Sequence, residues 1–182
     1  VYFGGGTPSL LSPPAMSRLF DTLYTAFAVP EGTQIVYEGN PDSLSERKIQ
    51  LLAENGRATR RTIGAQPLDD KLQAIVRRHN KQENVLDALA AARKYEIAHV
   101  NCDLMAGLPE QTMPSFQQDL AFLVSLEPDT VHLNAYRPLP RVRLERDGNA
   151  MDSDTVQLRD EMMAWGDEYL GTHGHGSHAQ GH

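Results

Sequence analysis

A regular alternation of short apolar runs and amphipathic segments is the feature that most constrains the fold of this chain. Five apolar, β-branched runs end near Gly5, Glu38, Gln66, Asp103 and Tyr136, so successive ends lie 33, 28, 37 and 33 residues apart. Two parallel strands need a crossover between them, usually a helix, and strands alternating with helical patterns are typical of parallel sheets. The repeat therefore predicts an α/β protein.

The segments between these runs predict helices. The first begins behind Ser12, with Pro13 as its first residue, and its apolar residues share one face: Met16, Leu19, Phe20, Leu23 and Phe27. Further helices are predicted at about 43–55, 84–95, 114–125 and 153–170. The residues predicted to face inward are Leu86, Leu89 and Ala90 in one of them and Phe116, Leu120 and Leu123 in another, with Thr112 as its cap.

Polar residues or glycines follow each apolar run, which favours a partial (β/α) barrel of the TIM type, with about five βα units, over an open sheet. A barrel gathers its site from the carboxyl ends of several strands. These ends carry Gly4 to Thr7, Glu38 with Asn40 and Pro41, Gln66, Asp103 with Gly107 to Pro109, and Tyr136 with Pro138 to Pro140. Such a rim suits a polar small molecule with several functional groups.

Composition excludes several classes of function. The net charge of −7 and pI near 5.4 argue against a nucleic-acid or anionic-membrane surface, and no apolar run is long enough for a membrane helix. Cytoplasmic residence is expected. A single cysteine, Cys102, excludes a disulfide framework and a cysteine-ligated cluster built from this chain alone. We therefore assign no metal ligands, and no catalytic residue is identified.

Five separated motifs carry a family resemblance. In order, they are VYFGGGTPSLLS, YEGNPDSL, IGAQPLDDKLQAIVRRHN, VNCDLMAGLPEQTMPSFQQDL and LEPDTVHLNAYRPLPRVRL. Over roughly residues 1 to 146 the chain resembles the radical S-adenosylmethionine (SAM) enzymes of the oxygen-independent coproporphyrinogen III oxidase, or dehydrogenase, type. The resemblance implies a partial radical SAM core over 1–150. The apolar pattern predicts one further helix over 151–171, and the Gly/His-rich composition of 172–182 predicts a disordered tail.

The resemblance also implies site residues. Gly5, Gly6 and Thr7 match the glycine-rich strand end that takes the methionine part of SAM, and Glu38 matches a carboxylate that contacts SAM. The remaining matches are to positions that bind SAM or a second SAM, or make a further contact: Gln66, Arg78, Asp103 and Arg137.

Family members hold a [4Fe-4S] cluster on a CxxxCxxC-type motif and use it to cleave SAM, which produces a radical that abstracts hydrogen from the substrate. That motif and the first barrel strand are expected upstream of the glycines. The chain as given is therefore expected to be inactive, as a fragment of a protein of porphyrin biosynthesis or a related reaction. Its expected partners are a small-molecule substrate of the porphyrinogen class and an electron donor, not nucleic acid or membrane.

Alternatives remain open. The parent protein is alternatively a haem chaperone of the same family or an enzyme that methylates or cyclopropanates its substrate. The chain itself is alternatively a non-catalytic fragment. The glycines alternatively serve close packing, Glu38 and Asp103 alternatively cap turns, and Arg78 alternatively pairs with Asp69 or Asp70 on a solvated face.

Overall fold

The computed structural model describes residues 1–57, 60–64, 67–76, 81–137 and 153–175. Gln66, Arg78 and most of the predicted tail lie outside the described residues, as do Pro138 to Pro140. The chain forms two compact units, Val1–Gly64 with Lys81–Asn101 and Ala65–Asn80 with Cys102–His182. Its five strands follow the order β1-β2-β3-β4-β5 in the sheet, and β4 runs from the first unit into the second.

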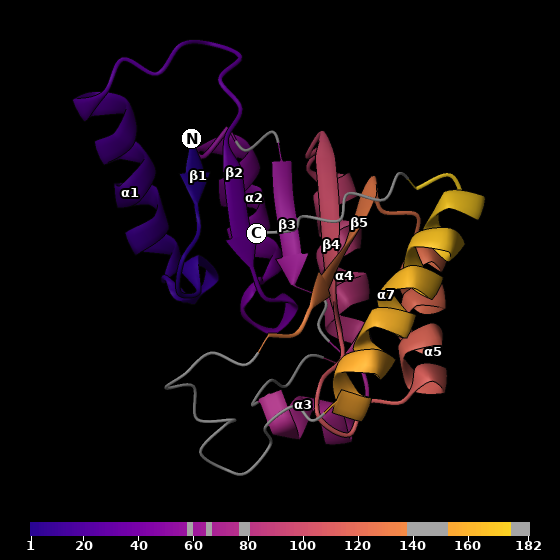
Figure 1. The fold of residues 1–182 in the computed structure, drawn as a ribbon. Helices are drawn as coiled ribbons and strands as arrows, with labels where there is room; N and C mark the ends of the chain where they lie inside the picture. The colour runs from indigo at the N-terminus through magenta and orange to yellow at the C-terminus, as the bar shows by residue number, and fades with distance from the viewer. Residues whose placement is uncertain (58–59, 65–66, 77–80, 138–152, 176–182) are drawn as a thin grey trace. The chain divides into compact units, whose positions relative to one another are not determined.

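The first unit is built on three parallel strands (Figure 1). Its strands are β1 (Tyr2–Phe3), β2 (Val36–Gly39) and β3 (Arg60–Gly64), and its helices are η1 (Pro8–Leu10), α1 (Pro13–Ala26), η2 (Pro41–Ser43), α2 (Glu46–Glu54) and α4 (Gln82–Lys94). The ring of Phe20 on α1 packs 5.6 Å from that of Phe3 and 6.1 Å from that of Tyr37, centroid to centroid. These aromatic contacts join α1 to the first two strands.

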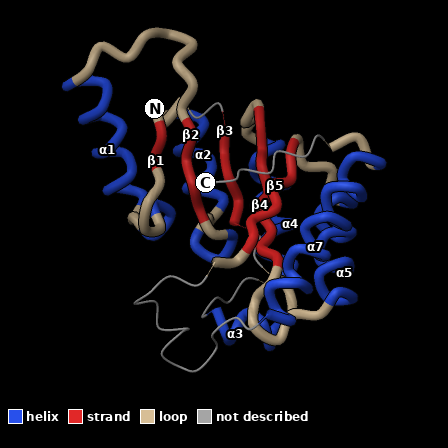
Figure 2. The backbone as a smooth tube through the Cα atoms, viewed as in Figure 1, coloured by secondary structure: helices blue, strands red, loops and turns tan. Residues whose placement is uncertain are grey.

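The second unit contains the end of β4 (His99–Ala106), β5 (Thr130–Ala135), α3 (Asp70–Val76), α5 (Met113–Ser125) and α7 (Ser153–Thr172). Figure 2 shows α5 and α7 side by side, in agreement with their contacts. Phe116, Leu120 and Leu123 of α5 are fully buried, as the sequence predicts, and the Thr112 side chain accepts a hydrogen bond from the backbone of Ser115 at the helix start. α7 covers the predicted last helix.

Three predictions of the sequence analysis are wrong in detail. Leu89 is buried as predicted, but Leu86 and Ala90 are exposed, and the other buried residues of α4 are Val85, Ala88, Ala91 and Ala92. Phe27 is 65% exposed because α1 ends at Ala26 and Phe27 is extended. β4 continues three residues past Asp103, so that carboxylate lies inside the strand. The short helix α3 was not predicted.

Gly166 allows α7 to approach the sheet closely. A Cβ at Gly166 would lie 2.5 Å from Leu133 Cδ1 and 3.3 Å from the Phe116 ring. We expect Gly166→Leu to lower the free energy of unfolding of the second unit by about 1–3 kcal/mol, since it overpacks a filled space. Urea unfolding followed by the fluorescence of Trp165, the single tryptophan, measures this change.

Gly171 provides the matched control. It lies on the same helix, and a Cβ there would meet open space. Gly171→Leu should leave stability unchanged or raise it by up to about 1 kcal/mol, because leucine favours helix over glycine. Equal losses in the two variants would contradict the packing role of Gly166.

Candidate functional site

The carboxyl ends of β1 and β2 bring a glycine turn and a carboxylate together. The strands pair in parallel, with Phe3 opposite Tyr37, so Gly4 and Glu38 come next at the same level. A Cβ at Gly4 would lie 2.7 Å from Glu38 Oε2 and would also meet the Tyr2 ring. A side chain at this position would require the Glu38 carboxylate or the Tyr2 ring to shift. The other carboxylate oxygen of Glu38 accepts a hydrogen bond from the Tyr2 hydroxyl.

Gly5 and Gly6 face open space. Gly5 has a φ of 106°, a conformation that favours glycine, and a Cβ at either residue would meet no atom within 4 Å. Thr7 ends the turn, and its carbonyl accepts a hydrogen bond of 3.0 Å from the amide of Leu10. A ligand can therefore approach this backbone closely while its cationic group lies near Glu38.

Asp103 lies beside a histidine in the second unit. Asp103 Oδ1 of β4 is 3.7 Å from His132 Nδ1 of β5, and the two side chains are 28% and 20% exposed. Both are half-buried while the neighbouring Cys102, Leu104, Val131 and Leu133 are buried, so the pair lies on the face opposite the hydrophobic one. This placement makes Asp103 a strand-face residue, not the cap of the turn that follows.

The turn after β4 is held by Gln111. Its side-chain oxygen accepts hydrogen bonds from the amides of Gly107 and Leu108 at 2.7 and 3.0 Å, and its nitrogen donates to the Met105 carbonyl at 3.1 Å. Gly107 has a φ of 81°, and a Cβ there would collide with Arg159. Gln111 was not singled out from the sequence, although its place just after Gly107-Leu108-Pro109 is a usable signal.

The structure describes six of the eight predicted site residues. Gly5, Gly6, Thr7 and Glu38 lie together in the first unit. Asp103 and Arg137 belong to the second unit, where Arg137 is exposed just after β5. The other two, Gln66 and Arg78, lie outside the described residues.

The buried polar contacts behind the glycine turn are not predicted from the sequence either. Ser9 is fully buried, and the Lys48 ammonium of α2 donates to the carbonyls of Ser9 and Ser43. Lys48 lies beside Ile49 and one turn before Leu52, which are both fully buried. A lysine so close to the apolar stripe of an amphipathic helix is the signal that could have identified it.

The residues of this chain do not fit an iron–sulfur cluster. A four-iron cluster takes about three to four cysteine thiolates. The sequence contains one cysteine, Cys102, which is buried in β4. Among the described residues, no group of three or more His, Cys, Asp or Glu could hold a metal ion. Glu38 and the open glycine backbone do fit an amino-acid group.

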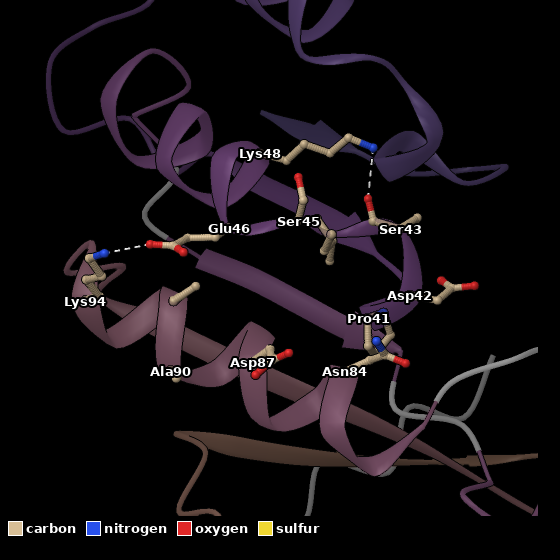
Figure 3. Close-up of a pocket in the computed structure, with 12 residues that line it drawn as sticks. Pro41, Asp42, Ser43, Ser45, Glu46, Lys48, Asn84, Asp87, Ala90 and Lys94 are labelled. Atoms are coloured by element: carbon tan, nitrogen blue, oxygen red, sulfur yellow. Dashed lines mark hydrogen bonds and ion pairs between the residues drawn. The ribbon is translucent and has the colours of Figure 1, made fainter.

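A cavity of about 710 Å³ lies between η2, the start of α2, and α4 (Figure 3). None of the six predicted site residues that the structure describes lines it. On its wall, Lys94 Nζ lies 2.6 Å from Glu46 Oε1, and both side chains are more than half exposed. This ion pair and the hydrogen bond from the Tyr95 hydroxyl lower the pKa of Glu46.

In the part of the chain that the structure covers, no helix is long and apolar enough to cross a membrane.

Comparison with known proteins identifies relatives of this chain. The Radical SAM superfamily matches residues 1–123. The oxygen-independent coproporphyrinogen III oxidase of Paracoccus denitrificans is 32% identical over 140 residues, which are 77% of this chain and 31% of that protein. Heme chaperone HemW of Bacillus subtilis is 31% identical over 137 residues, which are 75% of this chain and 35% of that protein. The chain thus spans about a third of the length of these relatives.

A solved structure shares the fold. The coproporphyrinogen III oxidase HemN from Escherichia coli, a radical SAM enzyme, matches with a TM-score of 0.85 and 27% identity over 95% of this chain and 40% of that one. The predicted α/β fold, with its parallel five-stranded sheet as part of a barrel, is confirmed.

Proposed function

The chain belongs to the radical SAM superfamily, and on that premise we propose that the loops after β1 and β2 bind the amino-acid group of SAM. The observation that carries this proposal is the Glu38 carboxylate beside the open turn at Gly5 and Gly6. Members of the family use SAM with a [4Fe-4S] cluster, which together supply a radical that abstracts hydrogen.

Glu38 and the glycine turn would have separate tasks in this site. The carboxylate accepts hydrogen bonds from the ligand's ammonium group, and charge-assisted bonds of this kind are stronger than neutral ones. The backbone of Gly5 and Gly6 lies against the rest of the amino-acid group because no side chain intervenes. Asp103, Arg137, Gln66 and Arg78 are proposed as further contacts of the same ligand or of a second one.

For the whole protein we propose the coproporphyrinogen oxidase type of reaction, with a porphyrinogen-class substrate and an external electron donor. The similarity to the oxidase of Paracoccus denitrificans supports this assignment. The similarity to heme chaperone HemW favours haem delivery as the second candidate. Titration with haem separates the two, since a chaperone holds haem stoichiometrically and the oxidase type does not require it.

Glu38→Gln tests the proposed ligand site. S-Adenosylhomocysteine and 5′-methylthioadenosine are both adenosine thioethers, but only the first carries an amino-acid group. The wild-type chain should bind the first more tightly in equilibrium dialysis. We expect Glu38→Gln to reduce this preference about tenfold, because an acceptor for the ammonium group loses its charge.

Glu31→Gln is the matched control, since it removes the same charge from an exposed loop of the same unit. It should leave the preference for S-adenosylhomocysteine unchanged. A wild-type chain that does not distinguish the two compounds would overturn the proposed function.

A further inference from the structure

Ser9 joins the loops after β1 and β2 from behind. Its hydroxyl shares a hydrogen bond of 2.6 Å with the Ser43 hydroxyl and accepts another of 3.1 Å from the Asn40 amide. Ser9 itself is fully buried. Ser9 lies in η1, after the glycine turn. Asn40 and Ser43 come after Glu38: Asn40 directly precedes η2, and Ser43 is its last residue. One buried hydroxyl thus links the two loops that carry the candidate ligand site.

Lys48 adds a charged group to this link. Its ammonium donates hydrogen bonds of 2.6 Å to the Ser9 carbonyl and 2.9 Å to the Ser43 carbonyl. The Lys48 ammonium is partly removed from water, and this burial lowers its pKa. The two carbonyls therefore replace part of the water that would otherwise solvate the charge. Figure 3 shows Lys48 extending from α2, with its bond to Ser43 drawn. A single side chain therefore holds one carbonyl of each loop.

The contacts of Ser9 and Lys48 lie close in sequence to the glycine turn and to Glu38. Ser9 is two residues from Thr7, and the Leu10 amide closes η1 onto the Thr7 carbonyl. The Tyr37 hydroxyl, from the residue before Glu38, donates to the Pro8 carbonyl at 2.7 Å. The contacts of Ser9, Lys48 and Tyr37 therefore connect the segment after the glycine turn to the strand and loop that carry Glu38.

Lys48 also lines the cavity between η2, α2 and α4, so it is alternatively a ligand of an anion there. Its two hydrogen bonds argue against this alternative, because the ammonium is engaged by loop carbonyls. Lys94, the other cation on the cavity wall, is paired with Glu46. The contacts of Lys48 point to the loops and not to the cavity.

We propose that Lys48, with Ser9, is a positioning residue that sets the glycine turn at the correct distance from Glu38 for the amino-acid group of an adenosyl sulfonium or thioether ligand. This inference rests on the proposed function of these loops. Removing the ammonium would leave two carbonyls without their donor and allow the loops to separate. Small displacements of a binding group reduce its contribution strongly.

Lys48→Met is the test, with Lys94→Met as the matched control. Both variants remove one ammonium that lines the same cavity, but only Lys48 contacts the loops. The measured quantity is the ratio of the affinities for S-adenosylhomocysteine and 5′-methylthioadenosine. We expect Lys48→Met to reduce the ratio roughly tenfold by weakening only the first compound, while Lys94→Met leaves it unchanged.

The ratio separates positioning from stability. A purely structural role of Lys48 would weaken both compounds alike or lower only the melting temperature. Should Lys48→Met fail to fold, Ser9→Ala decides, because it removes the hydroxyl link and keeps the lysine; it should reduce the ratio in the same direction.

Two failures are distinguishable. If the wild-type chain does not distinguish the two compounds, the proposed function is wrong and nothing remains to be positioned. In the second failure, the wild type distinguishes the two compounds and Glu38→Gln does not, but Lys48→Met retains the full affinity ratio. That result would show that the positioning role alone is wrong. Where Lys48→Met is unfolded, Ser9→Ala takes its place in this comparison.

Discussion

Replacing Phe20 with alanine is expected to lower the free energy of unfolding of the first unit by about 3–5 kcal/mol, the range for removing a fully buried aromatic side chain. The Phe20 side chain is 0% exposed, and its ring contacts those of Phe3 and Tyr37. Its loss leaves a cavity between α1 and the strands that precede the candidate site. Urea unfolding followed by far-ultraviolet circular dichroism measures the change.

Phe27→Ala is the control for this prediction. Phe27 lies seven residues later on what the sequence predicts to be the same face, but it is 65% exposed. Its replacement should change the free energy of unfolding by less than about 1 kcal/mol, as is usual for surface positions. Similar losses in the two variants would show that α1 does not pack on the sheet through Phe20.

Helical periodicity predicted where helices lie better than which side chains they bury. In α4 it identified Leu86, Leu89 and Ala90, whereas the buried residues include Val85, Ala88 and Ala92. Leu89 belongs to both possible stripes, so the large side chains alone could not decide between them. The small Ala88, Ala91 and Ala92 lie on the buried face, and alanines allow close approach of α4 to α2 and η2.

In the candidate site, too, the strand-end residues could be predicted from the sequence, and the buried contacts that join them could not. Glu38 and the glycine turn end neighbouring parallel strands, so their meeting follows from the βα repeat. The contacts between Ser9 and Ser43, and between Lys48 and both carbonyls, join residues 34, 39 and 5 positions apart. Serines and lysines are usually exposed. The apolar stripe of α2 indicates that Lys48 lies near the core, but the sequence does not specify Ser9, 39 residues away, as its partner.

Asp119 of α5 is another buried polar residue that is not predicted from the sequence, and it makes stability depend on pH. Its Oδ2 accepts a hydrogen bond of 3.0 Å from the Leu68 amide, just before α3, and the residue is 5% exposed. Burial raises the pKa of Asp119 from 3.8 to about 6; the Leu68 hydrogen bond opposes this rise, and the nearby Asp69 charge adds to it.

Because the folded-state pKa of Asp119 is the higher one, its contribution to stability is fully present below about pH 4 and is lost as the pH rises through about 6. The shift corresponds to about 3 kcal/mol. Asp119→Asn keeps an oxygen for the Leu68 amide and cannot ionise. Its free energy of unfolding, followed by Trp165 fluorescence in urea, should rise relative to wild type by about that amount between pH 4 and 7.5.

Asp69→Asn tests the assigned cause of this pH dependence. It removes the neighbouring negative charge, so Asp119 should ionise at a lower pH and the wild-type loss of stability should shift in that direction without disappearing. Asp69 also accepts hydrogen bonds from the amides of Lys71 and Leu72, and because asparagine keeps an oxygen for these bonds, the pH-independent part of the stability should change little. A difference between Asp119→Asn and wild type that stays constant from pH 4 to 7.5 would show that Asp119 ionises normally, and that its burial is relieved in solution.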